Sequence, residues 1–261
     1  MKSVNQLFDL SGKTALVTGG SRGLGFQIAL ALGEQGARIV LAARKQNELD
    51  EAVAQLKAQG IEASAVAADL SKEAGIAQLV AQAIERLGHI DVLVNNAGAT
   101  WGAPAEDHPV EAWDKLMNLN LRSVFLLSQA VGKQSMIPRR QGRVINIASI
   151  TGLRGNAPGT MKTIAYNTSK AAVLNFTRAL AGEWGPHGIT VNAIAPGFFP
   201  TRMTQAHLDK DEGVSLVDRA PMQRLGDEDD LKGAALLFAS EAGKHITGQV
   251  LAVDGGVSAV L

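Results

Sequence analysis

Short apolar runs alternate with longer amphipathic ones along the whole of this 261-residue chain, and no other feature limits its fold as strongly. Continuous apolar runs such as Ala15-Leu16-Val17 and Val92-Leu93-Val94 are typical of strands in a parallel sheet that is covered on both faces. A chain in which strands alternate with helices joins them by right-handed crossovers. The pattern therefore predicts an α/β fold with a doubly wound sheet.

We expect a single Rossmann-type domain over residues 1–261, with a seven-stranded parallel sheet flanked by helices on both faces, because no linker or repeat divides the chain. The predicted strands are Thr14–Thr18, Arg38–Ala42, Ala63–Ala67, Val92–Asn95, Arg143–Ala148, Thr190–Ile194 and Val250–Val253. The predicted helices are Gly25–Gln35, Gln46–Gln59, Lys72–Leu87, Val110–Met136, Ala165–Trp184 and Glu228–Ser240.

One segment breaks this rhythm. Residues 198–226 are long, polar in places and bounded by prolines. A loop of this length in a compact domain is usually functional, and it often covers a site. We therefore expect residues 198–226 to cover the substrate.

Composition limits the partners and the chemistry. Lysine and arginine together number 25, as do aspartate and glutamate, so no nucleic-acid or membrane-surface partner is indicated. The absence of cysteine excludes disulfides, thiolate metal sites and a cysteine nucleophile, and we expect no bound metal. The first residues lack the apolar stretch of a signal peptide, and no apolar run reaches membrane-spanning length. A cytoplasmic location is the default expectation.

A glycine-rich turn follows the first predicted strand, in the order Thr18-Gly19-Gly20-Ser21-Arg22-Gly23-Leu24-Gly25. Glycines allow a tight turn, let a pyrophosphate approach the backbone, and let the helix pack on the strand. The free N–H groups and the helix dipole then attract phosphate. Such a turn can also be merely tight, but its place in the first βαβ unit favours nucleotide binding.

The end of the second strand indicates which dinucleotide binds. An acidic residue there would bind the ribose hydroxyl of NAD, whereas an arginine accommodates the 2′-phosphate of NADP. The chain reads Leu41-Ala42-Ala43-Arg44-Lys45, and Arg22 in the glycine turn is a third nearby cation. Arg44 and Lys45 could instead be solvated charges at a helix entry. Three cations without an acid predict that NADP(H) is preferred over NAD(H).

The only tyrosine, Tyr166, stands four residues before Lys170 on a predicted helix. This spacing places both side chains on one face, where the ammonium favours the phenolate. Lowering the phenol pKa from ~10 to ~7 needs about 4 kcal/mol, which a single exposed ammonium does not supply. A second cation or a desolvated, hydrogen-bonded site is therefore required. Alone, the pair could be a chance arrangement.

With these motifs in order, the chain resembles the short-chain dehydrogenase/reductase family over nearly its whole length. The residues that carry the resemblance are Thr18–Gly25, Asp69-Leu70, Asn95-Asn96-Ala97-Gly98, Asn120, Ser149, Tyr166 with Lys170, Pro196-Gly197 and Val253-Asp254-Gly255-Gly256.

The resemblance implies a catalytic group. Tyr166 would be the general acid in reduction and the base in oxidation, and Ser149 would hydrogen-bond the substrate oxygen. Lys170, together with the positive nicotinamide ring, would lower the Tyr166 pKa and bind the ribose, while Asn120 would hold a water that connects Lys170 to solvent. Taken singly, Ser149 could cap a strand and Asn120 a helix.

The resemblance also implies a set of cofactor contacts. They are Gly19, Ser21, Arg22, Gly23, Leu24, Gly25, Arg44, Asp69, Leu70, Asn96, Ala97, Gly98, Tyr166, Lys170, Pro196, Gly197, Phe199 and Thr201.

Three features depart from the family pattern. The stretch from Ser149 to Tyr166 is longer than usual, through Gly159-Thr160-Met161-Lys162, and should affect specificity. Phe199 stands where the family often has an aliphatic residue whose backbone binds the carboxamide. Trp101 could line the substrate pocket, although packing in the core is the more frequent place for a tryptophan.

The function implied is NADP(H)-dependent hydride transfer between nicotinamide and a carbonyl or secondary alcohol. Residues 7–13 and the carboxy-terminal region look similar to gluconate 5-dehydrogenase-type members, which act on a keto sugar acid. Reduction of 3-oxoacyl thioesters or of a broad range of ketones is the alternative, and a non-catalytic NADP(H) sensor or assembly subunit is the alternative of another class. Family members are commonly tetramers, and the apolar end at residues 257–261 fits such an interface.

Overall fold

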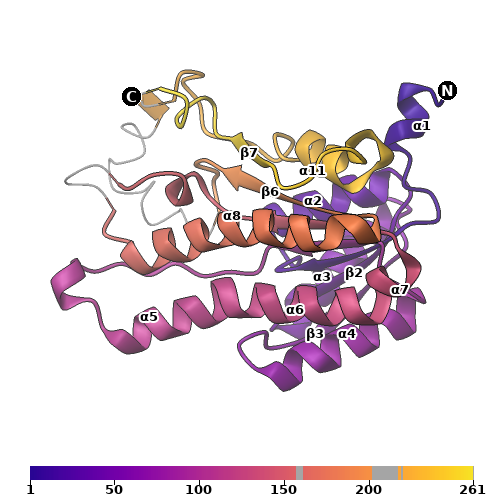
Figure 1. The fold of residues 1–261 in the computed structure, drawn as a ribbon, viewed down its shortest axis with the longest axis horizontal. Coiled ribbons are helices and arrows are strands. Elements are labelled where there is room, and N and C mark those ends of the chain that lie inside the picture. Colours follow the sequence, from indigo (N-terminus) through magenta and orange to yellow (C-terminus); the bar gives the residue numbers. More distant parts are fainter. Residues whose placement is uncertain (157–160, 202–216, 219, 261) are drawn as a thin grey trace.

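The computed structural model describes residues 1–156, 161–201, 217–218 and 220–260 (Figure 1). Within these ranges seven strands form one parallel sheet in the order β3-β2-β1-β4-β5-β6-β7. The strands are β1 (Thr14–Thr18), β2 (Arg38–Ala43), β3 (Ala63–Ala67), β4 (Val92–Asn95), β5 (Gly142–Ile147), β6 (Ile189–Pro196) and β7 (Val250–Val253). The predicted doubly wound sheet is confirmed.

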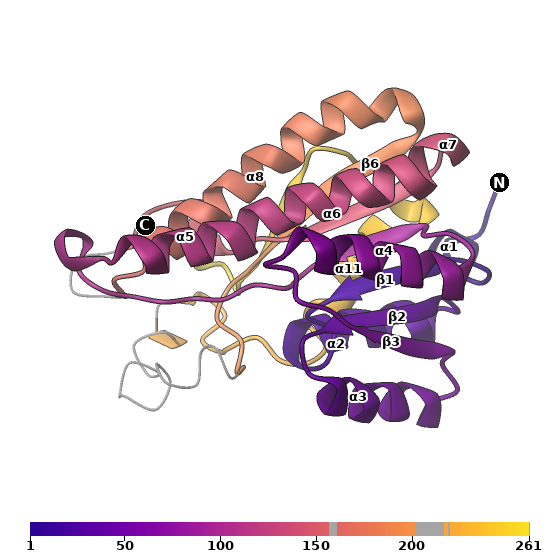
Figure 2. The ribbon, with the colours of Figure 1, turned by 90° about the horizontal axis from the view of Figure 1, so that it is seen from below.

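Helices cover both faces of the sheet (Figure 2). The α-helices are α1 (Val4–Phe8), α2 (Gly23–Glu34), α3 (Gln46–Ala58), α4 (Glu73–Leu87), α5 (Val110–Met117), α6 (Ser123–Val131), α7 (Ile137–Arg139), α8 (Ile164–Trp184) and α11 (Lys232–Ala239) among the described residues. Short 3₁₀ turns are η1 (Ala105–Asp107), η4 (Ile150–Gly152), η5 (Gly185–His187) and η6 (Glu241–Gly243). Helices α2, α3 and α11 pack on one face, and α4, α6 and α8 on the other.

The two cores follow from the side-chain alternation of buried strands. In β1, Val17 packs with Ile28 of α2 in one core, whereas Leu16 packs with Leu127 of α6 in the other. All five residues of β1 are buried, which explains its continuous apolar run. Burial of each large aliphatic side chain stabilises the fold by roughly 1.5–3 kcal/mol.

The strand order reverses between β1 and β4, which lie side by side although two strands (β2 and β3) and three helices (α2, α3 and α4) separate them in sequence. In open α/β sheets, ligands bind outside the carboxyl ends of the strands at this point of reversal. The glycine turn follows β1, and residues 96–98 follow β4. The fold therefore brings these two predicted motifs together.

The helix predicted over 110–136 is present but not uniform. Two π-helical segments, η2 (Asn118–Arg122) and η3 (Gly132–Met136), interrupt it. A π segment widens the helix locally and is frequently found at functional sites. The first of these segments contains Asn120, one of the predicted catalytic residues.

Two other differences concern the ends of the chain. Helix α1 was not predicted, because it has only five residues. A capping box between Ser3 and Gln6 stabilises its first turn. The helix predicted over 228–240 begins only at Lys232 in α11. Among the helices described, none has the length and apolar character needed to cross a membrane.

Candidate active site

The glycine turn is shaped so that its backbone is exposed to a ligand. Gly19 and Gly23 have φ values of +63° and +54°, a left-handed conformation that favours glycine. A Cβ on Gly25 would lie 2.4 Å from both Asn96 Nδ2 and Gly19 O. Helix α2 begins at Gly23, and its N-cap residue Arg22 makes no side-chain cap. The first N–H groups of α2 are thus left for an anion, which fits a nucleotide phosphate.

Asn96 and Ala97, which directly follow strand β4, form hydrogen bonds to the start of the glycine turn. Asn96 Nδ2 donates to the carbonyls of Thr18 and Gly19 at 2.9 and 3.2 Å. The N–H groups of Asn96 and Ala97 both donate to Thr18 Oγ1, at 3.0 and 3.1 Å. The structure therefore gives both residues a role in holding the turn, while their direct contact with a cofactor stays a prediction.

The end of β2 is less cationic than the sequence prediction assumed. Glu48, in the first turn of α3, accepts hydrogen bonds from Arg22 Nη1 at 2.5 Å and from Lys45 Nζ at 3.1 Å. These bonds hold the Glu48 pKa below its usual value. The expectation that Arg22, Arg44 and Lys45 have no acidic residue beside them is therefore wrong, because Glu48 binds two of them. Glu48 lies three residues after Lys45, a spacing that could have revealed the pair.

The remaining predicted residues near the adenosine end have different environments. Arg44 is exposed at the start of the β2–α3 connection. The Asp69 carboxylate accepts hydrogen bonds from the N–H and hydroxyl of Ser71 at 3.1 and 2.7 Å, and these lower its pKa. Leu70 is buried in the core that contains α4. Asp69 is thus the group of this pair that faces outward.

Tyr166 and Lys170 lie on the first two turns of α8, as predicted from their spacing. Lys170 Nζ lies 5.7 Å from the centre of the Tyr166 ring and donates a 2.8 Å hydrogen bond to the carbonyl of Ile147 at the end of β5. The Lys170 side chain is deeply buried, and loss of water lowers its pKa to about 8. Lys170 is thus a desolvated ammonium beside the phenol.

The Tyr166–Lys170 pair by itself does not give an acidic phenol, which agrees with the expectation that a single ammonium is not sufficient. Burial raises the pKa of the Tyr166 phenol above its usual value, and hydrogen bonding from the Ser149 hydroxyl only partly opposes the rise. Desolvation disfavours the charged form of both groups, because each charged form loses its hydration. It therefore lowers the pKa of Lys170 and raises the pKa of the Tyr166 phenol. A second cation is therefore required to lower the Tyr166 pKa, and the expected one is the positive nicotinamide ring.

Asn120 is buried in the π segment η2 and is fully engaged by its neighbours. Its Oδ1 accepts from the Ala99 N–H and its Nδ2 donates to the Ala99 carbonyl, both at 2.9 Å. Nδ2 also donates to Ser169 Oγ at 3.1 Å. A Cβ on Gly98 would lie 3.2 Å from Asn120 Oδ1 and 3.6 Å from Lys170 Nζ, so the two residues flank one point. The Asn120-bound water stays a prediction.

The residues after β6 approach the glycine turn. Pro196 ends the strand, and a Cβ on Gly197 would lie 2.7 Å from the Asp254 Cα, so the chain passes close to residues 253–256. The Phe199 side chain is buried in the core against Gly226, which leaves only its backbone for a carboxamide. The Thr201 methyl lies 3.8 Å from a Cβ built on Gly23.

Two sequence predictions fall largely outside the described residues. Residues 202–216 and 219 of the loop expected to cover the substrate, 198–226, lie outside the described residues, as do residues 159 and 160 of the extension predicted at 159–162. Trp101 does not pack in the core, because 41% of it is exposed and its ring meets His108 edge-on at 4.8 Å. Its place in a substrate pocket stays a prediction.

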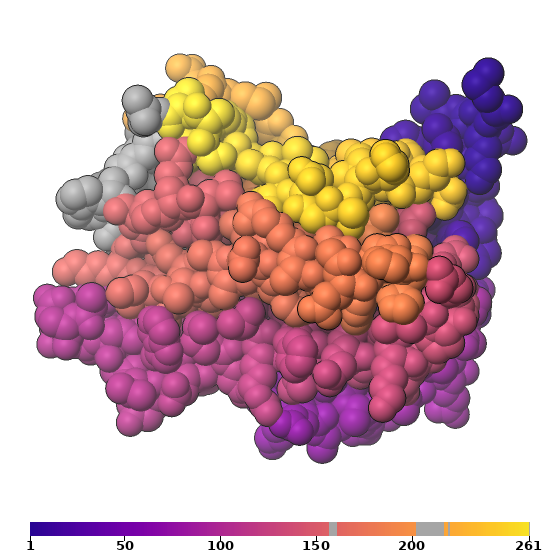
Figure 3. Space-filling model, in the orientation of Figure 1, coloured from indigo at the N-terminus to yellow at the C-terminus, as the bar shows by residue number. Residues whose placement is uncertain are grey.

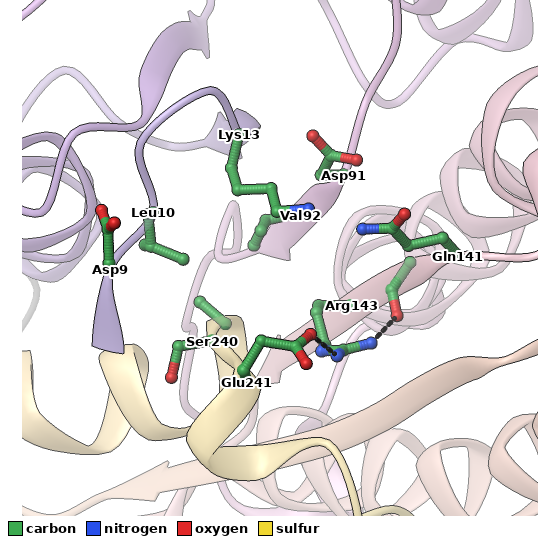
Figure 4. Close-up of a pocket in the computed structure, with 11 residues that line it drawn as sticks. Asp9, Leu10, Lys13, Asp91, Val92, Gln141, Arg143, Ser240 and Glu241 are labelled. Atoms are coloured by element: carbon green, nitrogen blue, oxygen red, sulfur yellow. Dashed lines mark hydrogen bonds and ion pairs between the residues drawn. The ribbon is translucent and has the colours of Figure 1, made fainter. Parts of the chain in front are cut away.

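A hollow of about 300 Å³, counted with the space at its mouth, lies at the opposite end of the sheet (Figure 4). Two ion pairs lie at this hollow: Arg143 pairs with Glu241 at 3.1 Å, and Asp91 pairs at 2.7 Å with Arg139, which is not part of the lining. None of the predicted site residues lines it. The hollow therefore belongs to the packing of β5 against η6 and not to the candidate active site.

A glycine-rich turn at the reversal point of the sheet, with a Ser-Tyr-Lys group beyond the neighbouring strand β5, is typical of dinucleotide-dependent oxidoreductases. Residues 13–212 match the short chain dehydrogenase family, and the chain belongs to that family. It is an oxidoreductase that acts on CH–OH donors. The resemblance stated from the motifs is confirmed.

Relatives of both expected kinds are found. Gluconate 5-dehydrogenase of Gluconobacter oxydans is 41% identical over 257 residues, which are 98% of this chain and 98% of that protein. The rhamnolipids biosynthesis 3-oxoacyl-(acyl-carrier-protein) reductase of Pseudomonas aeruginosa is 43% identical over 255 residues, 95% of this chain and 97% of the relative. A gluconate 5-dehydrogenase from Burkholderia cenocepacia, solved in complex with NADP and tartrate, superposes with a TM-score of 0.93 at 34% identity and covers 99% of this chain and 100% of that one.

Proposed function

We propose that this protein transfers a hydride between NADP(H) and a carbonyl or secondary alcohol, with a keto sugar acid as substrate. The observation that carries the proposal is the placement of Ser149, Tyr166, Lys170 and Asn120 beside an uncapped, glycine-rich helix start. Similarity to gluconate 5-dehydrogenases supports the sugar acid. Similarity to the rhamnolipids reductase supports a 3-oxoacyl thioester as the alternative substrate.

The side chains divide the work around the substrate oxygen. When bound, the nicotinamide supplies or accepts the hydride. Tyr166 gives a proton to the oxygen in reduction and removes it in oxidation, while Ser149 donates a hydrogen bond to the same oxygen. Lys170 holds positive charge beside the phenol, and Asn120 fixes the loop that passes Lys170 through its two bonds to Ala99.

The preference for NADP(H) is supported by charge and by similarity. Arg22, Arg44 and Lys45 outnumber Glu48, so the end of β2 keeps a net positive charge that suits a 2′-phosphate. Three similar solved structures contain NADP, including the gluconate 5-dehydrogenase above. In this chain the 2′-phosphate would compete with Glu48 for Arg22.

Steady-state assays test the reaction and the cofactor together. Purified protein is mixed with NADPH or NADH and with 5-ketogluconate, 3-oxoacyl thioesters or simple ketones. We expect 5-ketogluconate to give the highest kcat/KM, and NADPH to exceed NADH by about tenfold or more, which corresponds to ~1.4 kcal/mol. Equal kcat/KM for the two nucleotides would contradict the cofactor assignment. Tight NADPH binding without turnover on any substrate would favour the sensor alternative.

We also propose assembly into a tetramer through the helical face formed by α5–α7 and α8 (Figure 3) and through the edge strand β7. On α6, Phe125 is 45% exposed and meets Phe176 of α8 edge-on at 6.4 Å, and Leu251 of β7 is 38% exposed. Exposed apolar groups and open strand edges are typical of interaction surfaces.

The mass in solution tests this assembly. Light scattering during gel filtration is expected to give about 109 kDa, four times the 27.3 kDa of the chain. A monomer at micromolar concentration would contradict the proposed interfaces. The cytoplasmic location stays a prediction.

A further inference from the structure

Ser149 has a neighbour that no motif indicated. Ser149 is the residue between β5 and the 3₁₀ turn η4, and its Oγ accepts a hydrogen bond from the Thr151 N–H at 3.2 Å. Thr151 Oγ1 donates a second hydrogen bond to the same oxygen at 2.9 Å. Thr151 therefore contacts Ser149 Oγ with both its backbone and its side chain.

The number of hydrogen-bond donor and acceptor positions on a hydroxyl limits which further hydrogen bonds Ser149 can make. A serine hydroxyl offers one donor proton and two acceptor lone pairs. Thr151 fills both acceptor positions, so the remaining capacity of Ser149 is its single proton. Hydrogen bonding from Ser149 lowers the pKa of the Tyr166 phenol against the rise that burial causes, so the phenol is a neighbour that can receive the Ser149 proton. The two bonds from Thr151 thus leave the Ser149 hydroxyl free to act as a donor and not as an acceptor.

We infer that Thr151 is a positioning residue that keeps the Ser149 hydroxyl a donor, toward Tyr166 before substrate binds and toward the substrate oxygen once it is bound. This inference rests on the proposed reaction, in which a donor at that place stabilises negative charge on oxygen. If Ser149 were free to rotate, its lone pair could instead accept the phenol proton. Hydrogen bonding of that kind would favour the neutral phenol and would oppose proton transfer.

The turn that carries Thr151 is held firmly against the catalytic helix. A Cβ on Gly152 would lie 2.7 Å from the Lys170 carbonyl carbon and 2.8 Å from the Ala171 nitrogen, so η4 packs directly on the backbone of α8. The Gly152 N–H also donates to the Ser149 carbonyl at 3.0 Å. Thr151 therefore stays in place relative to α8, which carries both Tyr166 and Lys170. Lys170 Nζ lies 5.7 Å from the centre of the Tyr166 ring.

Two substitutions separate the hydroxyl from the shape of the side chain. Thr151→Val keeps the branched side chain and the backbone N–H but removes the hydroxyl. Thr151→Ser keeps the hydroxyl and removes the methyl group, so it is the matched control. A third variant, Thr151→Ala, also lacks the hydroxyl and serves if the valine variant does not fold, as judged by circular dichroism.

Tyr166 is the only tyrosine of the chain, so an ultraviolet titration of tyrosinate reports on this phenol alone. Thr151→Val is expected to raise the Tyr166 pKa and to lower kcat about tenfold, with the Kd for NADPH unchanged. Thr151→Ser is expected to stay within about twofold of the natural protein in kcat.

An unchanged tyrosine titration in Thr151→Val and Thr151→Ala would overturn the inference, as would equal losses in the valine and serine variants. The titration requires no turnover, so it separates this inference from the proposed function. If the natural protein bound NADPH but reduced none of the substrates, the proposed function would fail. The effect of the Thr151 substitutions on the Tyr166 titration could still be measured.

Discussion

Replacing Tyr166 with phenylalanine is expected to lower kcat by about 10²–10⁴-fold, the usual contribution of a positioned acid or base. The substitution removes only the hydroxyl, and the ring that faces Lys170 at 5.7 Å is retained. The fold and the glycine turn should be unaffected, because Tyr166 lies on α8 and the turn is held by Asn96. The Kd for NADPH, measured by fluorescence titration, should change by less than about threefold.

The matched control is Thr168→Ala, which removes an exposed hydroxyl two residues further along the same helix. This variant should keep the kcat of the natural protein. A fully active Tyr166→Phe variant would show that another group transfers the proton. A loss of NADPH binding equal to the loss of kcat would show instead that the phenol acts by binding.

Replacing Lys170 with methionine is expected to stabilise the cofactor-free protein while it abolishes most turnover. Burial lowers the Lys170 pKa from 10.5 to about 8, which corresponds to roughly 3 kcal/mol against the folded state at neutral pH. Methionine has a similar length and no charge, but it leaves the Ile147 carbonyl without its 2.8 Å partner, a loss of about 1 kcal/mol. The net gain in the free energy of unfolding should be about 2 kcal/mol at pH 7.

The pH dependence of this effect has a definite sign. Between the folded pKa of about 8 and the unfolded value of 10.5, the unfolded chain binds more protons at Lys170 than the folded protein does. The stability of the natural protein relative to the variant therefore rises with pH across this window. The advantage of Lys170→Met should be full below pH 8 and should shrink toward pH 10.5.

Urea unfolding at pH 7 and at pH 10 measures both values. The exposed Lys162 provides a matched control, because Lys162→Met alters a solvated charge near the same helix. It should change the free energy of unfolding by less than about 0.5 kcal/mol. A Lys170→Met variant that is less stable than the natural protein at pH 7 would contradict a desolvated ammonium at this site.

The sheet could be predicted from the sequence because buried parallel strands leave continuous apolar runs. Strand β1 matches its prediction at both ends, and β5 differs by one residue at each end. The candidate catalytic residues could be named because they occur in the family's order. The interruption of the long helix at Asn120 could not be predicted, because its apolar pattern continues through both π segments.

The contacts that tune the site could not be predicted either, because they depend on tertiary placement. Glu48 lies on α3, and only the fold brings its carboxylate to Arg22 in the glycine turn. Thr151 looks like any polar residue in a loop, and its bond to Ser149 arises from the tight 3₁₀ turn. Burial of Lys170 and of Tyr166, which lowers the pKa of the lysine and raises that of the phenol, depends on α8 packing against β5.

The backbone of residues 96–99, with the hydrogen bonds at its two ends, joins the glycine turn to the start of α8. Asn96 holds the glycine turn, Ala99 holds Asn120, Asn120 donates to Ser169, and Ser169 Oγ donates to the Tyr166 carbonyl at 2.7 Å. Four consecutive residues therefore connect the glycine turn with the segment of α8 that carries Tyr166. A change of length within residues 96–99 would alter this connection, whereas the segment between Ser149 and Tyr166 lies outside it.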